Sequence, residues 1–596
     1  MKAPQDSIRN FCVVSHIDHG KTTLTDRFLE ITHTQTASKL KERILDSNPI
    51  EQERGITIKL APVRMIYKNY IFNLIDTPGH VDFSYEVSRS LAACEGAILL
   101  VDVTQGIQAQ TMANASQALE QNLAIIPVIN KIDLPNTEIK KTIKQLQDTF
   151  GFSHKEIISI SAKTGQNLIQ LIKAIIEFIP PPSTRGNSQK PLQALIFNSF
   201  YHSHKGVIAS IRLFNGQIKK DQPLTLMSNH AKIVAEEIGY FLPNMESTDV
   251  LSVGEVGYIA TGLKDITLCR VGDTITSQSS PAQKSLPGYQ EAKPVVFMDL
   301  YPIGNQDFIK LKKALEKLQL VDSSLSFQPT SSPVLGSGLK VGFQGLLHAD
   351  IVQERLEREF NLELIATSPS VEYQVILKKA NQPVSILSPA DFPEPNLINQ
   401  IKEPFIELTI FTPSKYLGNI IKLCQDFRAQ LKDQKFFGQQ VKLTYHLPLQ
   451  ELISDFFGQL KSVSSGFASL DWQFIGFQSA DVVKLEVLLN RQPVKPLATL
   501  VIRSKAQTVA RTLAKKLKTI IPPQQFEIAI QIAHGSKILT RETIKALRKD
   551  VTAKLYGGDQ TRKDKLLKKQ KKGKKRLKQI GKITLPQEAF LAILKK

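Results

Sequence analysis

Five short segments between residues 15 and 163 carry the side chains that proteins use to hold and cleave a nucleoside triphosphate. In chain order they read Ser15-His-Ile-Asp-His-Gly-Lys-Thr-Thr23, Arg54-Gly-Ile-Thr57, Asp76-Thr-Pro-Gly-His80, Asn130-Lys-Ile-Asp133 and Ser161-Ala-Lys163. Any one of these patterns occurs by chance often enough to be weak evidence. All five in this order indicate a protein that binds GTP and hydrolyses it.

The first segment is predicted to form a phosphate-binding loop. It follows the apolar run Phe11–Val14, typical of a buried strand, and leads into Thr22–Ile31, whose apolar residues recur at helical spacing. In such a loop the backbone N–H groups face the β-phosphate, the Lys21 ammonium contacts the β and γ oxygens, and the Thr22 hydroxyl ligates Mg²⁺. The pattern usually begins with Gly or Ala, and Ser15 is small enough for the same turn.

Two further segments are expected to respond to the γ-phosphate. Asp76 ends the apolar run Ile71–Ile75, so its carboxylate is predicted to reach the Mg²⁺ shell through a water while the Gly79 N–H meets the γ-phosphate. The Thr57 hydroxyl is the expected second protein ligand of Mg²⁺, with an ordinary loop threonine as the alternative interpretation. Segments that are ordered by the γ-phosphate and released on hydrolysis act as switches.

Base selection is assigned to the last two segments. Asp133 follows the apolar run Ala124–Ile129 and can accept hydrogen bonds from both N1–H and the 2-amino group of guanine. Adenine offers neither pattern, so an unpaired carboxylate would discriminate against it by roughly 10⁴-fold. The segment Ser161–Lys163 is expected to close over the guanine from the other side.

His80 is the candidate for hydrolysis. It follows the expected γ-phosphate glycine, where it could orient the attacking water, and phosphoryl transfer depends mainly on such positioning. The alternative is a structural histidine that packs beside Phe83 and Tyr85.

The stretch Asp82–Gly96, together with Asn130–Pro135 and Ser161–Gly165, closely resembles the LepA family of ribosomal translational GTPases, also called elongation factor 4. The similarity continues through Gly342–His348, Gln353–Arg358 and the C-terminal end. The resemblance implies Mg²⁺-dependent hydrolysis of GTP to GDP and phosphate, stimulated by the ribosome. It also implies binding of the ribosome in the GTP form, through ribosomal RNA and tRNA, and action on the elongating ribosome, described for the family as back-translocation and linked to fidelity.

Motif matching to this family assigns the site residues. The catalytic set is His80, Lys21 and Asp18; Asp18 is also a candidate ligand of a monovalent cation, and Ile17 and Ile56 resemble an apolar gate beside the histidine. The metal ligands are Thr22, Thr57 and Asp76. The nucleotide-binding set is Ser15, His16, Ile17, Asp18, His19, Gly20, Lys21, Thr22, Thr23, Asp76, Thr77, Pro78, Gly79, His80, Asn130, Lys131, Asp133, Ser161, Ala162 and Lys163.

At 596 residues the chain is too long for one core, and we predict a multidomain α/β and α+β protein. The domain boundaries are suggested by turn and linker segments, such as Pro180–Ser188, and by the resemblance to elongation factor G. The predicted domains are a P-loop GTPase domain at 1–183, a translation-factor β-barrel at 189–280, ferredoxin-like domains at 293–368 and 400–481, similar to domains III and V of elongation factor G, and a LepA-specific C-terminal domain with a basic RNA-binding tail at 482–596.

The tail holds the strongest charge signal. Residues 561–580 contain eleven Lys or Arg and one acid, a net charge of +10 out of +21 for the chain. Such a block favours RNA phosphate as its partner, although a solvated disordered tail is the alternative. The apolar run Leu585–Leu594 suggests an anchor for it. The candidate RNA-binding residues are Arg562, Lys563, Lys568, Lys569, Lys571, Lys572, Lys574, Lys575, Arg576 and Lys578.

The cysteine content and the N-terminal sequence suggest an intracellular protein. Its four cysteines have no metal-binding spacing and indicate reduced thiols. The N-terminus lacks the pattern of a signal peptide, and we expect no transmembrane segment. A bacterial-type cytoplasmic monomer is expected, with peripheral contact to the inner face of the membrane left open.

Three other interpretations compete. A BipA or TypA-like ribosomal GTPase would share the first four domains, but Tyr85–Arg89 and the tail from Gly557 favour LepA. A ribosome assembly or RNA-binding factor with an inactive nucleotide domain is opposed by the intact Lys21, Asp76 and His80. The third alternative is an enzyme that uses GTP to activate a small molecule. It is opposed because this sequence shows no second set of catalytic residues.

Overall fold

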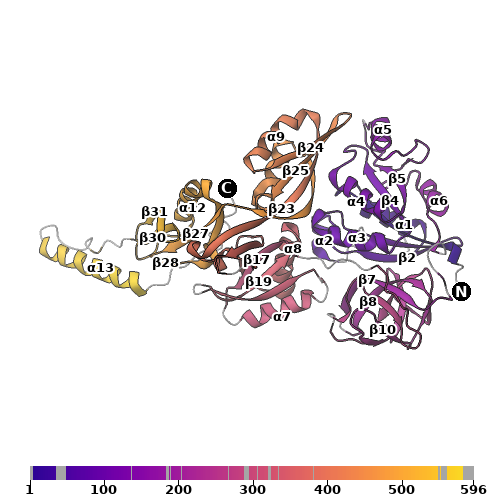
Figure 1. Ribbon diagram of the computed structural model, residues 1–596, viewed down its shortest axis with the longest axis horizontal. Coiled ribbons are helices and arrows are strands. Elements are labelled where there is room, and N and C mark those ends of the chain that lie inside the picture. Colours follow the sequence, from indigo (N-terminus) through magenta and orange to yellow (C-terminus); the bar gives the residue numbers. More distant parts are fainter. Residues whose placement is uncertain are drawn as a thin grey trace.

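The computed structural model shows an elongated molecule with the N-terminal domain at one extremity and helix α13 at the other (Figure 1). The residues that it describes are 5–34, 48–135, 137–182, 187, 189–202, 204–265, 268–287, 294–304, 307–319, 322, 324–332, 335–379, 382–547, 551 and 560–580, with side chains only to 573 at the end. No helix in this described part is long and apolar enough to cross a membrane.

The N-terminal domain is built on one six-stranded sheet, in the order β2-β3-β1-β4-β5-β6. The strands are β1 (Ile8–Ser15), β2 (Ala61–Tyr67), β3 (Tyr70–Asp76), β4 (Gly96–Asp102), β5 (Ala124–Asn130) and β6 (Ile158–Ser159). The helices are α1 (Lys21–Ile31), α2 (Pro49–Arg54), α3 (Ser84–Ala92), α4 (Ala109–Glu120), α5 (Ile139–Phe150) and α6 (Leu168–Phe178), with a 3₁₀ turn η3 (Val81–Phe83).

All strand pairs in this sheet except β2–β3 are parallel. Every residue of β1 and β4 is buried, as expected for strands covered by helices on both faces. Ligands of such sheets bind outside the carboxyl ends of the strands. The four predicted segments that follow β1, β3, β5 and β6 therefore meet at one edge.

The second domain is a sheet of eight strands in the order β11-β10-β16-β7-β8-β15-β12-β13, with a short β9-β14 pair. Its strands are β7 (Gln193–His202), β8 (Gly206–Asn215), β9 (Gln217–Lys219), β10 (Pro223–Leu226), β11 (Lys232–Val234), β12 (Glu237–Leu242), β13 (Asn244–Thr248), β14 (Val250–Ser252), β15 (Val256–Ala260) and β16 (Thr274–Ser277). A wholly buried ion pair, Arg212 Nη2 to Glu95 Oε1 at 2.8 Å, fastens it to the first domain.

Two α+β units follow, each with the chain order β-α-β-β-α-β of a ferredoxin-like unit. The first contains β17 (Val296–Pro302), α7 (Phe308–Gln319), β18 (Ser326–Ser332), β19 (Gly336–Phe343), α8 (Leu346–Phe360) and β20 (Leu364–Ala366). The second contains β23 (Ile398–Pro413), α9 (Leu417–Asp426), β24 (Gln430–Phe437), β25 (Gln440–Pro448), α10 (Leu449–Glu451), a π turn η10 (Leu452–Phe456), α11 (Phe457–Val463) and β26 (Ser469–Ser479).

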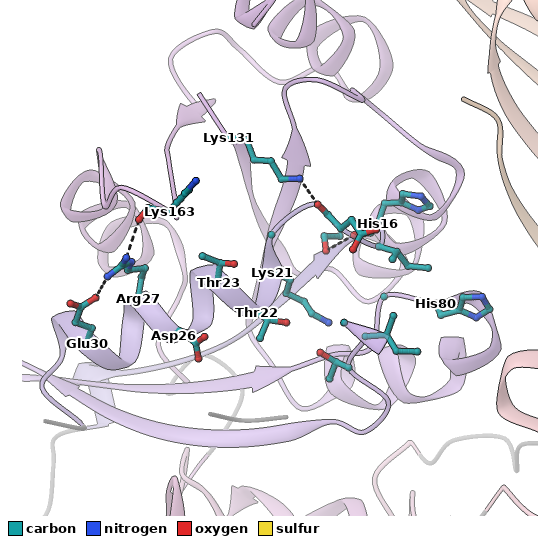
Figure 2. A pocket seen from close by; sticks show the side chains of 18 residues that line it. His16, Lys21, Thr22, Thr23, Asp26, Arg27, Glu30, His80, Lys131 and Lys163 are labelled. Carbon is teal, nitrogen blue, oxygen red and sulfur yellow. Dashed lines mark hydrogen bonds and ion pairs between the residues drawn. The ribbon is translucent and has the colours of Figure 1, made fainter. Parts of the chain in front are cut away.

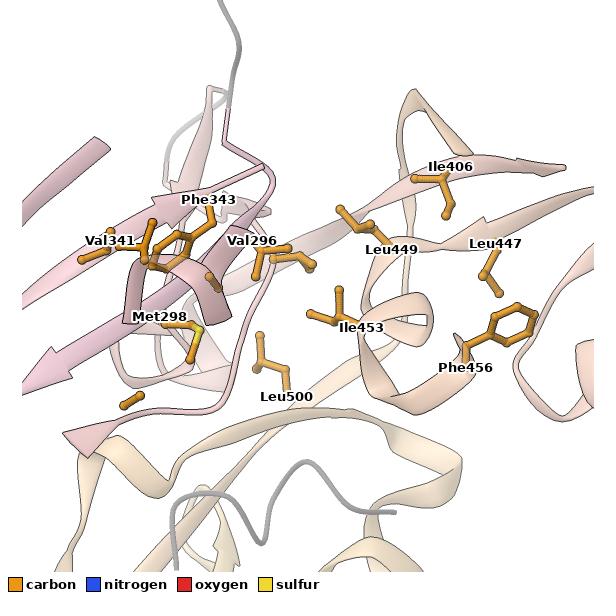
Figure 3. Close-up of a cluster of buried hydrophobic side chains, with 14 of the residues drawn as sticks. Val296, Met298, Val341, Phe343, Ile406, Leu447, Leu449, Ile453, Phe456 and Leu500 are labelled. Carbon is orange, nitrogen blue, oxygen red and sulfur yellow. The ribbon is translucent and has the colours of Figure 1, made fainter. Parts of the chain in front are cut away.

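Two local features of this region were not predicted. Residues between the two predicted ferredoxin-like domains form β21 (Tyr373–Leu377) and β22 (Pro383–Ile386), and β21 pairs with the start of β23. The helical run from Leu449 to Val463 is interrupted at Asp455, which has a positive φ of 71°. Buried side chains of both units form one continuous core, in which Met298 and Phe343 of the first share a cluster with Ile453 and Phe456 of the second (Figure 3).

The last domain packs helix α12 (Ala506–Ile520) against β27 (Val482–Leu489), β30 (Ile528–His534) and β31 (Lys537–Ile544), with β28 (Gln492–Pro493) and β29 (Thr499–Ile502) beside β27. The basic block lies in helix α13 (Gln560–Ile580), which extends away from the other domains (Figure 1). The predicted anchor Leu585–Leu594 lies outside the described residues.

Candidate nucleotide site

A cavity of about 650 Å³ lies at the carboxyl edge of the N-terminal sheet (Figure 2). Figure 2 shows Lys21 near its middle, with Lys131 and Lys163 toward one end and His80 at the other. The residues that line it are Ser15, His16, Ile17, Asp18, Gly20, Lys21, Thr22, Thr23, Asp26, Arg27, Glu30, Gly55, Ile56, Thr57, Gly79, His80, Lys131 and Lys163. Each of the five motifs contributes to this lining.

The loop between β1 and α1 has the features of a phosphate cradle. Gly20 has a φ of +90°, and a Cβ there would lie 2.4 Å from Asn130 Nδ2, so both conformation and space require glycine. Lys21 begins α1, which places its side chain and the helix N-terminus beside the cavity. Its Nζ lies 3.8 Å from Asp76 Oδ1. A positive helix end and a lysine ammonium together favour a polyanion.

The three predicted metal ligands occupy two layers. Thr22 and Thr57 line the cavity, whereas Asp76 is completely buried behind Lys21, where its Oδ1 accepts from Thr77 N at 3.1 Å. Two hydroxyls and a carboxylate are hard oxygen donors that suit Mg²⁺, an ion that keeps several waters and binds substrate phosphates. The site therefore fits this ion.

Asn130 connects the two ends of the cavity from behind. Its Nδ2 donates to His19 O at 3.0 Å, and its Oδ1 accepts from Ala162 N at 2.9 Å. Asp133 is exposed, and its Oδ1 accepts from Ser161 Oγ at 2.6 Å. The predicted guanine-binding segments are thus held together, with the Asp133 carboxylate oriented by the neighbouring segment.

Lys131 crosses the cavity end in a left-handed conformation, with a φ of 66°. Its Nζ donates to Asp18 O at 2.5 Å and lies 2.7 Å from Asp102 Oδ2. Burial raises the pKa of Asp102, but hydrogen bonds from Lys131 and Thr104 outweigh it, so this pKa lies below its usual value. Sequence reasoning missed Asp102, which ends β4 at the same sheet edge as the motifs.

His80 lines the cavity and also packs beside Phe83, so both predicted environments are present. Its Nδ1 accepts from Asp82 N at 3.1 Å, and the His80 and Phe83 ring centroids lie 6.3 Å apart. Of the other two histidines of the site, His19 is buried and His16 is partly buried, and this burial lowers the pKa of His16 to about 4 and that of His19 to about 3. Both are therefore neutral at neutral pH.

Eight of the predicted nucleotide-binding residues do not line the cavity. They support the lining from behind or beside it, as Thr77 does by donating from Oγ1 to Val13 O at 2.7 Å. These residues are His19, Asp76, Thr77, Pro78, Asn130, Asp133, Ser161 and Ala162.

Helix α1 contributes three lining residues that sequence reasoning missed: Asp26, Arg27 and Glu30. Arg27 donates from Nε to Ala162 O at 3.1 Å and from Nη2 to Lys163 O at 2.9 Å, and so braces the last motif. The signal was available, because residues four apart lie on one helix face and Arg27 follows Thr23 by four.

The candidate RNA-binding residues belong to α13, which lies at the opposite end of the molecule from the N-terminal domain (Figure 1). The side chains of Arg562, Lys568, Lys569, Lys571 and Lys572 are exposed, and Lys563 is partly buried. For Lys574, Lys575, Arg576 and Lys578 the structure describes only the helical backbone.

Four protein-family models each match a different part of the chain. Residues 6–181 match "Elongation factor Tu GTP binding domain" and residues 206–276 match "Elongation factor Tu domain 2". Residues 400–488 match "Elongation factor G C-terminus" and residues 489–595 match "GTP-binding protein LepA C-terminus".

Known proteins are similar over the whole chain. Elongation factor 4 of Thermotoga maritima is 51% identical, over 99% of this chain and 96% of that protein. Elongation factor 4 of Aquifex aeolicus is 49% identical, over 99% of each, and a chloroplastic translation factor GUF1 homolog of Ricinus communis is 49% identical, over 100% of this chain and 86% of its own. A crystal structure of a Thermus thermophilus protein shares the fold, with a TM-score of 0.61 at 16% identity over 80% of this chain and 97% of that one.

Proposed function

Since this chain belongs to the elongation factor 4 (LepA) family of translational GTPases, we propose that it binds the ribosome in its GTP form and hydrolyses GTP to GDP and phosphate under ribosomal stimulation. The observation that carries this proposal is that the same cavity is lined by Lys21, Thr22, Thr57 and His80. A BipA or TypA-type factor or a pure assembly factor is not favoured, because residues 489–595 match the LepA C-terminus.

Each residue has a proposed task. The phosphate loop and Lys21 bind the β- and γ-phosphates, and Thr22, Thr57 and the Asp76 carboxylate hold Mg²⁺, which when bound neutralises phosphate charge. Asp133 selects guanine, braced by Ser161. His80 orients the attacking water, with Ile17 and Ile56 as apolar neighbours in the lining. We assign a monovalent cation to Asp18 as a further part of this proposal.

The switch segments rest on helix α8 of the first α+β unit, which suggests how nucleotide state is transmitted. Arg54 of α2 pairs with Glu354 at 2.6 Å, and Arg358 pairs with Glu53 at 2.7 Å. The Asp82 carboxylate of η3 accepts from Leu347 N at 2.9 Å and thus caps α8. We propose that changes at the γ-phosphate reposition α8 through these contacts.

The remaining proposals concern the whole protein. The exposed lysines of α13 are proposed to bind ribosomal RNA or tRNA, in a cytoplasmic monomer that acts on the elongating ribosome by back-translocation. No feature of the described residues favours membrane association. The predicted five-domain boundaries, at 1–183, 189–280, 293–368, 400–481 and 482–596, remain part of the proposal.

The proposal is tested by measuring phosphate release from GTP and ATP, with and without ribosomes. We expect slow release from GTP alone, strong stimulation by ribosomes and no release from ATP. A rate of phosphate release from GTP that ribosomes do not raise, or equal use of ATP, would contradict the proposal. Titration calorimetry with GTP and Mg²⁺ checks binding separately from hydrolysis.

A further inference from the structure

A buried glutamine on α4 holds the backbone on both sides of His80. Gln110 is 6% exposed and is the second residue of the helix. One orientation of its amide satisfies all of its neighbours: Nε2 donates to Gly79 O at 2.7 Å and to His16 Nδ1 at 2.5 Å, and Oε1 accepts from Val81 N at 3.3 Å. None of the predicted motifs includes this residue.

The two backbone contacts bracket the His80 Cα. The Gly79 carbonyl belongs to the peptide group before it, and the Val81 N–H belongs to the peptide group after it. Fixing both peptide planes fixes the φ and ψ of His80, and with them the direction of its Cα–Cβ bond. The ring is then held through Nδ1 by Asp82 N.

The third contact connects this loop to the phosphate cradle. Burial keeps the pKa of His16 near 4, so its ring is neutral and Nδ1 can accept a hydrogen bond. Ala109, the residue before Gln110, donates from its backbone N to Ser469 Oγ of β26 at 2.8 Å. A small cavity beside His80 and Gln110 is also lined by Asp471 and Trp472 of that strand. The start of α4 therefore connects the phosphate loop and the histidine loop, through Gln110, with the second α+β unit, through Ala109.

We propose that Gln110 is a positioning residue for hydrolysis, which acts through His80 by holding its backbone against the phosphate loop. This inference rests on the proposed GTPase function. It assigns Gln110 a larger part in the rate of cleavage than in nucleotide affinity, because the side chain does not itself line the nucleotide cavity.

The test compares Gln110→Met, which preserves side-chain length but removes all three hydrogen bonds, with wild type in single-turnover GTP hydrolysis on ribosomes. Misplacement of a catalytic group by about 1 Å can cost on the order of 10²-fold. We expect a slowing of roughly 10- to 100-fold, with GTP affinity and melting temperature close to wild type.

A double-variant cycle with His80→Ala separates positioning from general damage. If Gln110 acts through His80, Gln110→Met should cost little further in the His80→Ala background. The matched control is Gln121→Met at the end of the same helix, where the amide donates to Ser88 O and not to the site.

Three outcomes would overturn the inference. They are a wild-type rate for Gln110→Met, a loss of rate that only parallels a loss of GTP affinity, and the same slowing in both backgrounds. A wild-type rate for His80→Ala would remove the proposed role of His80 and this inference with it. Absence of ribosome-stimulated hydrolysis in the wild-type protein would instead refute the proposed function.

Discussion

At the scale of single residues, the site consists of a lining layer that faces the nucleotide cavity and a buried layer that holds it. Lys21, Thr22 and Thr57 belong to the first layer, whereas Asp76 and Asn130 belong to the second. The motifs identified members of both layers, because a motif records which residues are needed and not which of them reach the ligand.

His80 gives the first prediction. The variant His80→Ala should bind GTP normally and lose most ribosome-stimulated turnover, because water orientation is lost while the phosphate contacts remain. Single-turnover phosphate release on ribosomes measures this. The control is His154→Ala, an exposed histidine of the same domain. Unchanged turnover in His80→Ala would assign the residue a structural role.

Asn130 gives the second prediction. The variant Asn130→Ala leaves His19 O and Ala162 N without their side-chain partner in a buried region, which should cost about 1 to 3 kcal/mol in the stability of the nucleotide-binding domain. We expect weaker GDP binding together with a lower melting temperature. Calorimetric titration and thermal unfolding check both, and an unchanged GDP affinity would show that the brace is dispensable.

At the scale of elements, helix α8 is the surface on which both switch segments rest. Ile50, Ile58 and Phe83 of the first domain form a buried cluster with Ile351 of α8. The same contact contains charged groups, since His348 Nε2 lies 2.9 Å from Asp322 Oδ2. Apolar contacts hold the elements together, while the charged groups make the stability of the contact depend on pH.

The cap at the start of α8 gives the third prediction. Asp82 accepts from both Leu347 N and His348 N, so Asp82→Ala should lower the stability of this contact by about 1 kcal/mol, the usual cost of losing a helix cap. Amide hydrogen exchange at residues 347 and 348 should become faster. The control Asp307→Ala, beside α7 in the same unit, should leave that exchange unchanged.

The pH dependence of this contact gives the fourth prediction. Burial raises the pKa of Glu86 to about 7, with Arg89, Asp322, Lys59 and His348 as its charged neighbours. A carboxyl whose pKa is raised on folding contributes stability below its unfolded pKa and loses it as the pH rises through the folded pKa. The loss amounts to at most about 3 kcal/mol, at 1.36 kcal/mol for each pKa unit.

The melting temperature should therefore fall between pH 5 and pH 8, and less so in Glu86→Gln, which stays neutral. His348 acts in the same direction, because burial is outweighed by Asp322 and its pKa is raised. Asp322 acts in the opposite direction at low pH, since His348 and Ser324 hold its pKa below the usual value despite burial. Parallel pH profiles for wild type and Glu86→Gln would contradict the assignment.

At the scale of the whole molecule, the N-terminal domain, whose residues line the nucleotide cavity, and the basic helix α13 lie at opposite extremities (Figure 1). The fifth prediction concerns α13: replacing Lys568, Lys569, Lys571 and Lys572 by Gln should weaken ribosome binding and flatten its dependence on salt. Each lost phosphate contact reduces the slope of log K against log salt by roughly 0.7 to 0.9. Pelleting with ribosomes at several salt concentrations measures the slope, and an unchanged slope would assign the helix no phosphate contacts. GTP affinity should not change.

The sequence by itself determined the fold class and identified most of the residues that line the cavity. Strand β1 and helix α1 lie close to where apolar periodicity placed them, because such local patterns are written in consecutive residues. The interruption at Asp455 and the β21–β22 hairpin were not predicted, and the hairpin is held in place by the pairing of β21 with β23, a strand that begins about twenty residues later.

Only the tertiary structure decided which residues from separate segments meet. Gln110, Asp102 and Arg27 lie outside the motifs, yet each contacts a motif residue or its backbone. Asp82 is separated from its partner Leu347 by 265 positions. A hydrogen bond between such residues depends on the arrangement of whole domains in space. No local pattern in the chain shows which distant residues this arrangement brings together.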